Sequence, residues 1–193
     1  MSQNDTARQI IEAARTLLDE GGVSAVSMRK VAEKVGVTAM AIYRHFPDHK
    51  ALLNALADQG FAELAAVMLT LELSGGGMER LTMTADAFID HALANPRLFE
   101  LMFLTPREGA RQYPRDFKAG LSPTANLFAQ AVEQGIRAGQ FRDADPWEIT
   151  FETGALLQGL IMLYLGGRFE AGPDDFRLFC RRALRRYIDG IHA

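Results

Sequence analysis

The chain has 193 residues, of which 48% are hydrophobic and 23% charged, proportions that favour a globular protein with a sizeable core and argue against disorder. Its single cysteine, Cys180, excludes an intrachain disulfide and a four-cysteine zinc site. The formal net charge of −3 argues against a nucleic-acid binder that is basic throughout.

The first predicted element is a helix that begins near Thr6, where Thr6 and Gln9 form a capping box, and ends at Gly21 and Gly22. Here and along the rest of the chain, apolar residues recur at helical spacing with almost no β-branched alternation. The sequence therefore predicts an all-α fold.

Two short helices follow within residues 27–50. Ser27 is predicted to cap a helix that runs to Val35, Gly36 to supply a tight turn, and Thr38 to cap a helix of about nine residues that stops at Pro47. Two short helices joined by such a turn form the helix-turn-helix that places a helix in the major groove of DNA, although helix pairs also occur in ordinary bundles.

Positive charge and an exposed aromatic residue distinguish this stretch. Its five basic and two acidic residues give residues 27–50 a net charge of +3, so the rest of the chain carries −6. If Ile42 and Phe46 face the core, then Met40, Tyr43 and Arg44 must project outward. A basic, aromatic outer face favours contact with DNA over a purely structural helix.

The rest of the chain is predicted to be a helical bundle. A fourth helix is expected at 49–73, a break at 74–77, and a loop or poorly ordered helix at 105–122. Further helices are expected at 79–94, 96–103, 123–138, 146–165 and 173–191.

The most apolar stretch, 155–165, is only about half the length needed to span a bilayer. Because the N-terminus also lacks secretory features, we expect a cytoplasmic protein with no membrane partner.

The run from Val37 to Pro47, VTAMAIYRHFP, resembles the recognition helix of tetracycline-repressor (TetR) type transcriptional regulators. Residues 27–32 and 48–53 resemble the neighbouring elements of that family. The resemblance implies an N-terminal three-helix, helix-turn-helix DNA-binding domain at 1–50. A long fourth helix would link it to a C-terminal helical domain at 51–193 for ligand binding and dimerisation.

The resemblance also implies roles for individual side chains in binding DNA. Phosphates would be contacted by Ser27, Thr38, Tyr43 and His45. Bases would be read by Arg29, Ala39, Met40 and Arg44, and arginine is suited to guanine. Ala41 stands where the family commonly has threonine, and His49 where it often has lysine, so we expect the adjacent Lys50 to be the charged phosphate contact. The candidate DNA-binding residues are Ser27, Arg29, Thr38, Ala39, Met40, Tyr43, Arg44, His45, His49 and Lys50.

Each of these residues also has a plainer interpretation. His45 and His49 lie four residues apart and could bind a metal ion, but the sequence offers no third ligand. Ser27 and Thr38 could act as helix caps alone. Tyr43 could be an ordinary surface residue.

Two further sites are predicted in the C-terminal half. Aromatic residues, methionines and polar groups within apolar helices could line an effector pocket, although most would equally serve a core. These are Phe88, His91, Phe99, Met102, Phe103, Phe128, Phe151, Glu152, Gln158 and Met162. By the family resemblance, the last two helices would form a dimer interface that includes Leu156, Gly159, Leu160, Leu163, Phe176, Phe179 and Leu184.

The arginine-rich last helix is interpreted as a solvated face or as a source of interface ion pairs, in preference to a second nucleic-acid patch. Cys180 is interpreted as a buried hydrophobe and not as a redox sensor.

The sequence thus predicts a ligand-responsive DNA-binding regulator, a homodimeric repressor released from a palindromic operator by a small-molecule effector. It would be neither an enzyme nor dependent on a cofactor. The alternatives are an all-helical small-molecule-binding protein or enzyme with a structural N-terminal region, and an architectural or protein-binding helical dimer. No nucleophile, acid pair, phosphate loop or metal cluster in the sequence supports the enzyme.

Overall fold

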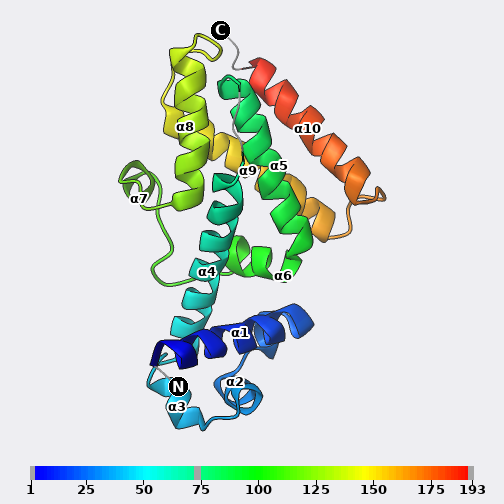
Figure 1. The fold of residues 1–193 in the computed structure, drawn as a ribbon. Helices are drawn as coiled ribbons and strands as arrows, with labels where there is room; N and C mark the ends of the chain where they lie inside the picture. The colour runs from blue at the N-terminus through cyan, green and yellow to red at the C-terminus, as the bar shows by residue number, and fades with distance from the viewer. Residues whose placement is uncertain (1–2, 72–74, 191–193) are drawn as a thin grey trace. The chain divides into compact units, whose positions relative to one another are not determined.

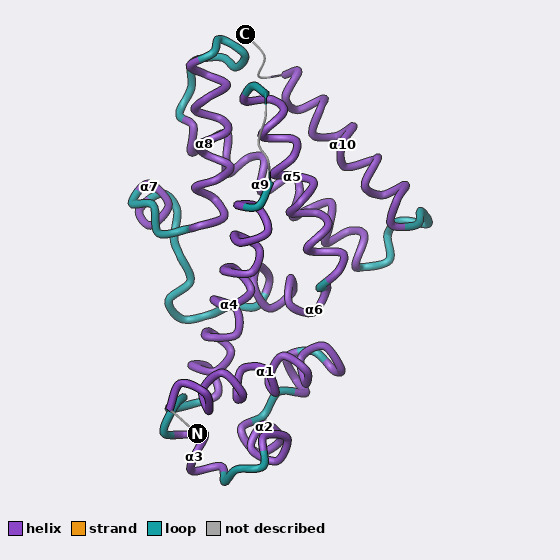
Figure 2. Tube along the Cα trace, viewed as in Figure 1, coloured by secondary structure: helices purple, strands orange, loops and turns teal. Residues whose placement is uncertain are grey.

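The computed structural model describes residues 3–71 and 75–190. Within these ranges the regular secondary structure consists of helices (Figures 1 and 2), which confirms the all-α prediction. The chain forms two compact units. The first contains the chain up to Phe61 together with Asn95–Ala110, and the second contains Ala62–Ala94 together with the chain from Arg111 onward. The boundary at residues 50 and 51 stays a prediction.

The first unit is built around the N-terminal helices. It contains α1 (Gln3–Gly21), η1 (Val23–Ala25), α2 (Met28–Val35), α3 (Ala39–Tyr43) and the beginning of α4 (His49–Leu69). Helix α1 packs against α2, and α2 packs against α3. The fully buried side chains that hold them together are Ile10, Leu18, Val31, Ile42, Leu52 and Leu56.

The ends of α1 and α4 differ from the predicted ones. Helix α1 already begins at Gln3, so Thr6 lies inside the helix and the predicted Thr6–Gln9 capping box is wrong. The predicted stop is confirmed, because α1 ends at Gly21 and Gly22 has φ 71°. Helix α4 ends at Leu69, four residues before the predicted end. Residues 72–74 of the predicted helix end and break lie outside the described residues.

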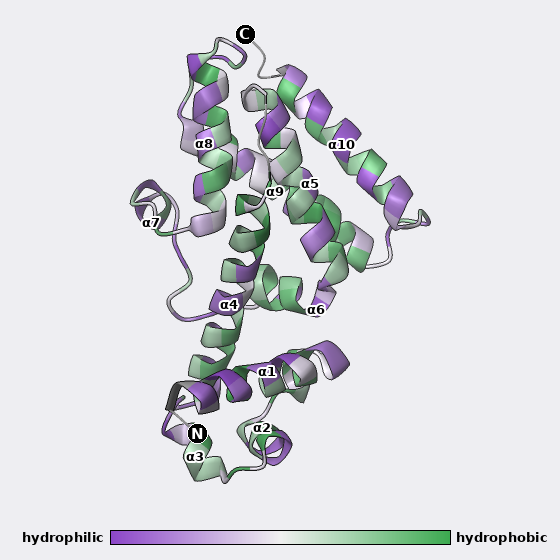
Figure 3. Cartoon of the chain, viewed as in Figure 1, coloured by the Kyte–Doolittle hydropathy of each residue, from purple (hydrophilic) through white to green (hydrophobic). Residues whose placement is uncertain are grey.

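Helix α4 is the one described helix that is long and apolar enough to cross a membrane by length and composition. Figure 3 shows its mainly hydrophobic ribbon. Its side chains Leu52, Leu56 and Leu64 are at most 1% exposed, so they already lie in the protein core. Val67 and Leu69, near its end, are 46% and 70% exposed, so the helix is buried over only part of its surface.

The helix predicted at 96–103 is divided in two. An α-helical turn, α6 (Pro96–Phe99), is followed by a π-helical turn, η2 (Glu100–Leu104), in which the Thr105 N–H donates to the Glu100 carbonyl at 3.0 Å, five residues back. This segment lies close to α4 at Gly60, because a Cβ there would be only 2.7 Å from the Met102 sulfur. The first unit therefore includes a piece of chain from well beyond the helix-turn-helix.

The second unit is a bundle of long helices. It contains α5 (Gly77–Ala94), α7 (Arg115–Lys118), α8 (Pro123–Arg137), α9 (Pro146–Leu165) and α10 (Pro173–Gly190). Helix α5 packs against α8, α9 and α10, and α9 packs against α8 and α10. The bounds of α9 are as predicted, and the predicted loop at 105–122 contains one short helix, α7.

Candidate nucleic-acid interface

Two side-chain caps and one glycine define the helix-turn-helix. The Ser27 hydroxyl accepts a hydrogen bond from the Lys30 N–H at 3.3 Å, and the Thr38 hydroxyl accepts one from the Ala41 N–H at 3.3 Å. Gly36 ends α2 in the left-handed region, with φ 78°. Both predicted caps and the predicted turn are confirmed.

Helix α3 presents an apolar side to the core and a mixed side to solvent. It spans only five residues, fewer than predicted, although the Phe46 N–H still donates to the Ile42 carbonyl at 2.9 Å beyond its end. Ile42 is fully buried, whereas Met40 is 66% exposed and Tyr43 46% exposed. Arg44 is exposed as well. The predicted outward orientation of Met40, Tyr43 and Arg44 is confirmed.

The remaining predicted residues of the helix-turn-helix differ in exposure. Arg29 on α2 and Ala39 on α3 are exposed, whereas Ser27 and His45 are half-buried. Phe46, which was expected to share the inner face with Ile42, is also half-buried. Among the predicted residues of this region, Arg29, Met40, Tyr43 and Arg44 thus offer the larger exposed side chains.

His49 has an internal contact that the sequence did not indicate. Its Nε2 atom lies 2.9 Å from the Val26 carbonyl oxygen, which ties the start of α4 to the residue before the Ser27 cap. The described residues hold no group of three potential metal ligands. The ring of His49 therefore has a clear structural use.

Lys50 forms an ion pair with a residue far along the chain. Its Nζ atom lies 2.9 Å from Glu108 Oε1, and the two side chains are 70% and 77% exposed. The Glu108 carboxylate raises the pKa of the Lys50 ammonium, mainly by accepting its hydrogen bond, so Lys50 stays protonated. Asn54 donates from Nδ2 to the backbone carbonyl of Glu108 at 3.1 Å.

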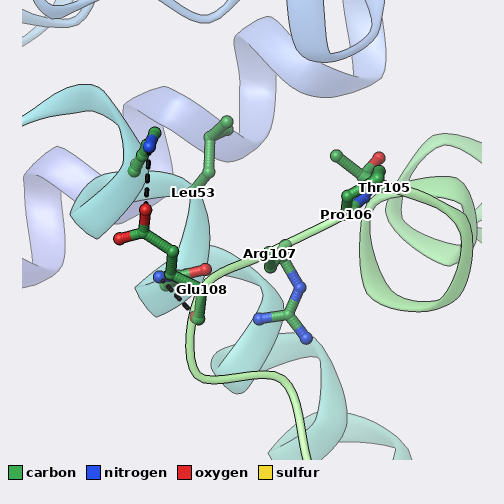
Figure 4. A pocket seen from close by; sticks show the side chains of 7 residues that line it. Leu53, Thr105, Pro106, Arg107 and Glu108 are labelled. Atoms are coloured by element: carbon green, nitrogen blue, oxygen red, sulfur yellow. Dashed lines mark hydrogen bonds and ion pairs between the residues drawn. The ribbon is translucent and has the colours of Figure 1, made fainter.

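Glu108 belongs to a loop beside an open pocket. The pocket measures about 330 Å³, and Figure 4 shows Leu53 and Glu108 on its wall with both contacts of Glu108 dashed. The lining residues are Lys50, Leu53, Asn54, Thr105, Pro106, Arg107 and Glu108. Sequence reasoning missed Asn54 and Glu108, because no local pattern connects a residue in a predicted loop with the start of α4.

The residues of the predicted effector pocket are distributed over both units. Phe99, Met102 and Phe103 belong to the first, where Phe103 packs edge-to-face on Phe61 with ring centroids 5.2 Å apart. In the second unit, Phe88 and Phe128 pack edge-to-face at 6.2 Å. The other predicted members in the second unit are His91, Phe151, Glu152, Gln158 and Met162.

Three of these members have surroundings that the prediction did not include. Phe151 is 40% exposed and contacts Tyr113 and Phe117, which sequence reasoning missed. Glu152 accepts a hydrogen bond from the Tyr187 hydroxyl at 2.7 Å, and Met162 is 47% exposed. A single pocket formed by all ten residues stays a prediction.

The residues of the predicted dimer interface fall into two groups. Phe176 and Leu184 are at most 2% exposed, and Phe176 stacks on Tyr164 with centroids 4.2 Å apart, so both belong to the core of their own subunit. Leu163 is 49% exposed. The half-buried members are Leu156, Gly159, Leu160 and Phe179.

The arginines of α10 form ion pairs within the subunit. Arg181 bonds Asp86 at 2.8 Å, and Arg177 pairs with Asp90, so α10 is joined to α5 by two ion pairs. Figure 3 shows that hydrophilic and hydrophobic residues alternate along α10. Cys180 is fully buried, and burial raises the pKa of its thiol to about 11. The predicted solvated face and buried cysteine are confirmed, because Arg181, Arg182, Arg185 and Arg186 are exposed. The ion pairs to α5 lie within the subunit, whereas the sequence predicted ion pairs at an interface.

A capped helix-turn-helix with an exposed tyrosine and arginine on its second helix, followed by a separate helical bundle, defines a DNA-binding regulator of transcription. The comparisons agree. The sequence-family model for bacterial regulatory proteins of the tetR family matches residues 10–56. The family model for the tetracyclin repressor-like C-terminal domain matches residues 81–187. The chain belongs to the TetR family of transcriptional regulators.

Relatives with curated names extend over most of the chain. An HTH-type transcriptional repressor from Mycobacterium tuberculosis is 37% identical over 89% of this chain and 86% of its own length. The class A tetracycline repressor from Escherichia coli is 31% identical over 77% of this chain, and the chain spans 64% of that repressor. The solved structure of the regulator FadR from Bacillus subtilis, in complex with stearoyl-CoA, has a TM-score of 0.76 at 18% identity, covering 96% and 99% of the two chains.

Proposed function

We propose that this protein is a cytoplasmic, homodimeric repressor that binds a near-palindromic DNA operator and is released from it by a small-molecule effector. The single observation that carries the proposal is the outward orientation of Met40, Tyr43 and Arg44 on a helix whose inner residue, Ile42, is fully buried. Such a helix can enter the major groove without disturbing the core.

Within this proposal, the contacts divide into two kinds. Phosphates accept hydrogen bonds from the hydroxyl groups of Tyr43, Ser27 and Thr38. They are also contacted by His45 and by the cation Lys50. Base edges are read by the exposed residues of α2 and α3, namely Arg29, Ala39, Met40 and Arg44. We assign His49 to the support of α4, because its ring is held by the Val26 carbonyl.

Dimerisation is proposed to occur through α9 and α10. Phe151, Met162, Leu163 and Leu178 are 40% to 49% exposed in the isolated subunit, and a second copy would cover them. A symmetric dimer would place its two recognition helices in successive major grooves, roughly 34 to 36 Å apart, and would therefore need an operator with two-fold symmetry.

An effector is proposed to bind in the second unit. The FadR complex supports the existence of an effector, because a protein of the same fold is in complex with stearoyl-CoA. The buried Thr150 hydroxyl, which has no hydrogen-bond partner among the described residues, is a polar group that a ligand or water could satisfy. A ligand that binds better to the form unable to engage DNA would weaken operator binding through its differential affinity.

Electrophoretic mobility shift against the DNA that flanks the protein's own gene tests the proposal. We expect a discrete complex that competes poorly with unrelated DNA and weakens as the salt concentration rises. If the protein shifted every DNA fragment equally, or shifted none, the result would contradict the proposed function. If a complex forms, a thermal-shift screen of small apolar compounds, followed by release assays, identifies effectors.

A further inference from the structure

We propose that Glu108 competes with DNA phosphate for Lys50, so that this carboxylate lowers the affinity of the protein for its operator. The inference rests on the proposed function, which assigns Lys50 to a phosphate contact. It adds an internal anion that occupies the same ammonium group in the absence of DNA.

The carboxylate is held in position independently of its own charge. Asn54 donates to the backbone carbonyl of Glu108 at 3.1 Å, one helical turn after Lys50 on α4. Lys50 Nζ lies 2.9 Å from Glu108 Oε1 (Figure 4). The amide of Asn54 therefore fixes the loop, and the ion pair depends on the loop.

The segment that carries Glu108 is attached to the first unit at further points. Arg15 on α1 donates to Asn95 Oδ1 at 2.5 Å, at the start of the segment. Near its end, the guanidinium of Arg107 lies 5.8 Å from the centre of the Phe61 ring on α4, within cation–π range. These contacts bring Glu108 to Lys50 as part of the same compact unit.

The electrostatic consequence follows from the charges. Paired with Glu108, Lys50 adds no net charge to the surface, whereas a DNA phosphate requires a positive partner. A phosphate that approaches the ammonium also approaches the carboxylate and is repelled by it. DNA must therefore displace Glu108. The free energy of the Lys50–Glu108 ion pair is lost when DNA binds, which makes the free energy of binding less favourable.

The size of the effect is limited by exposure. Ion pairs between exposed side chains are weak, so the loss of this one should change affinity by about two- to five-fold for each subunit. The pair consequently adjusts operator affinity without abolishing it. The effect should be largest at low salt, where charges are least screened.

The test is a double-mutant cycle on operator binding, with Glu108→Gln, Lys50→Ala and the double variant. Glutamine keeps the shape of the side chain, and the Asn54 bond to the backbone is unaffected. We expect Glu108→Gln to tighten binding about two- to five-fold for each subunit. We also expect it to steepen the dependence of log K on log salt by about one unit for each subunit, because one more cation is free to replace counterions. Lys50→Ala should weaken binding, and Glu108→Gln should have a smaller effect in that background, where only the direct repulsion of phosphate is relieved.

Glu12→Gln is the matched control, because it removes one negative charge from the exposed Arg8–Glu12 pair of the same unit. It should leave binding unchanged. Asn54→Ala provides a second test, because it frees the loop without altering charge and should reproduce part of the gain in affinity.

If the wild type binds the operator but Glu108→Gln leaves affinity unchanged or lowers it, the competition is refuted while the proposed function stands. A gain of the same size in the Lys50→Ala background also refutes it. Absence of any operator complex with the wild type refutes both.

Discussion

Tyr43 at the end of α3 and Arg44 directly after it are both exposed, yet we expect substitutions of them to have different consequences. Tyr43→Phe removes a hydroxyl proposed to bind phosphate, so it should weaken binding to all operator sequences by a similar factor. Arg44→Ala removes a group proposed to read a base. It should alter base preference, at a cost of about 1–3 kcal/mol for the preferred base.

Binding of a set of single-base operator variants separates the two effects. A uniform loss for Arg44→Ala would assign Arg44 to the DNA backbone. A changed preference for Tyr43→Phe would assign Tyr43 to a base.

Thr38 is expected to matter for stability as well as for DNA. Its hydroxyl satisfies the Ala41 N–H at the start of a helix of only five residues. Thr38→Ala should therefore lower the free energy of unfolding by about 1 kcal/mol, whereas Thr38→Ser should keep the cap. Urea denaturation followed by circular dichroism measures both. Equal destabilisation by serine and alanine would show that the hydroxyl is not the stabilising group.

At the scale of elements, the close packing of α8 against α5 and against Phe141 depends on two glycines. A Cβ at Gly77 would lie 2.3 Å from the Gly135 nitrogen, and a Cβ at Gly135 would lie 2.3 Å from the Phe141 ring. Alanine favours helices over glycine by up to about 1 kcal/mol, but overpacking costs about 1–3 kcal/mol. We therefore expect Gly135→Ala to be destabilising overall.

Gly154→Ala in α9 is the matched control. Its Cβ would meet only the Gln158 side chain, at 3.7 Å, so the substitution should be neutral or stabilising. Thermal denaturation of the two variants should give shifts of opposite sign or of clearly different size. A Gly135→Ala protein as stable as the wild type would mean that the Phe141 ring can move aside at little cost.

At the scale of the whole molecule, the exposed residues of α9 test the proposed dimer. Leu163→Glu places a charge where a second subunit would bury it, and should shift the protein from dimer to monomer without unfolding it. Leu69→Glu, at a leucine that is 70% exposed on α4, should leave the dimer intact. Analytical ultracentrifugation measures both. A Leu163→Glu protein that stays dimeric would move the interface elsewhere.

The local features of the fold could be read from the sequence because neighbouring residues produce them. Ser27 and Thr38 cap helices through bonds to residues three positions ahead, and Gly36 turns the chain where φ is positive. The outer face of α3 followed from helical periodicity, and the family resemblance added roles to its side chains. The shorter length of α3 and the divided segment 96–104 were missed, because tertiary packing overrides local preference there.

The distant pairings were decided by the tertiary structure alone. Glu108 meets Lys50 across 58 residues, and Arg181 meets Asp86 across 95. No periodic pattern encodes such contacts, because they depend on how whole helices pack and where a loop returns to the first unit. The sequence by itself thus determined a helix-turn-helix with its exposed face, since capping and periodicity act over a few residues. Only the packed chain decided which carboxylate lies against its Lys50.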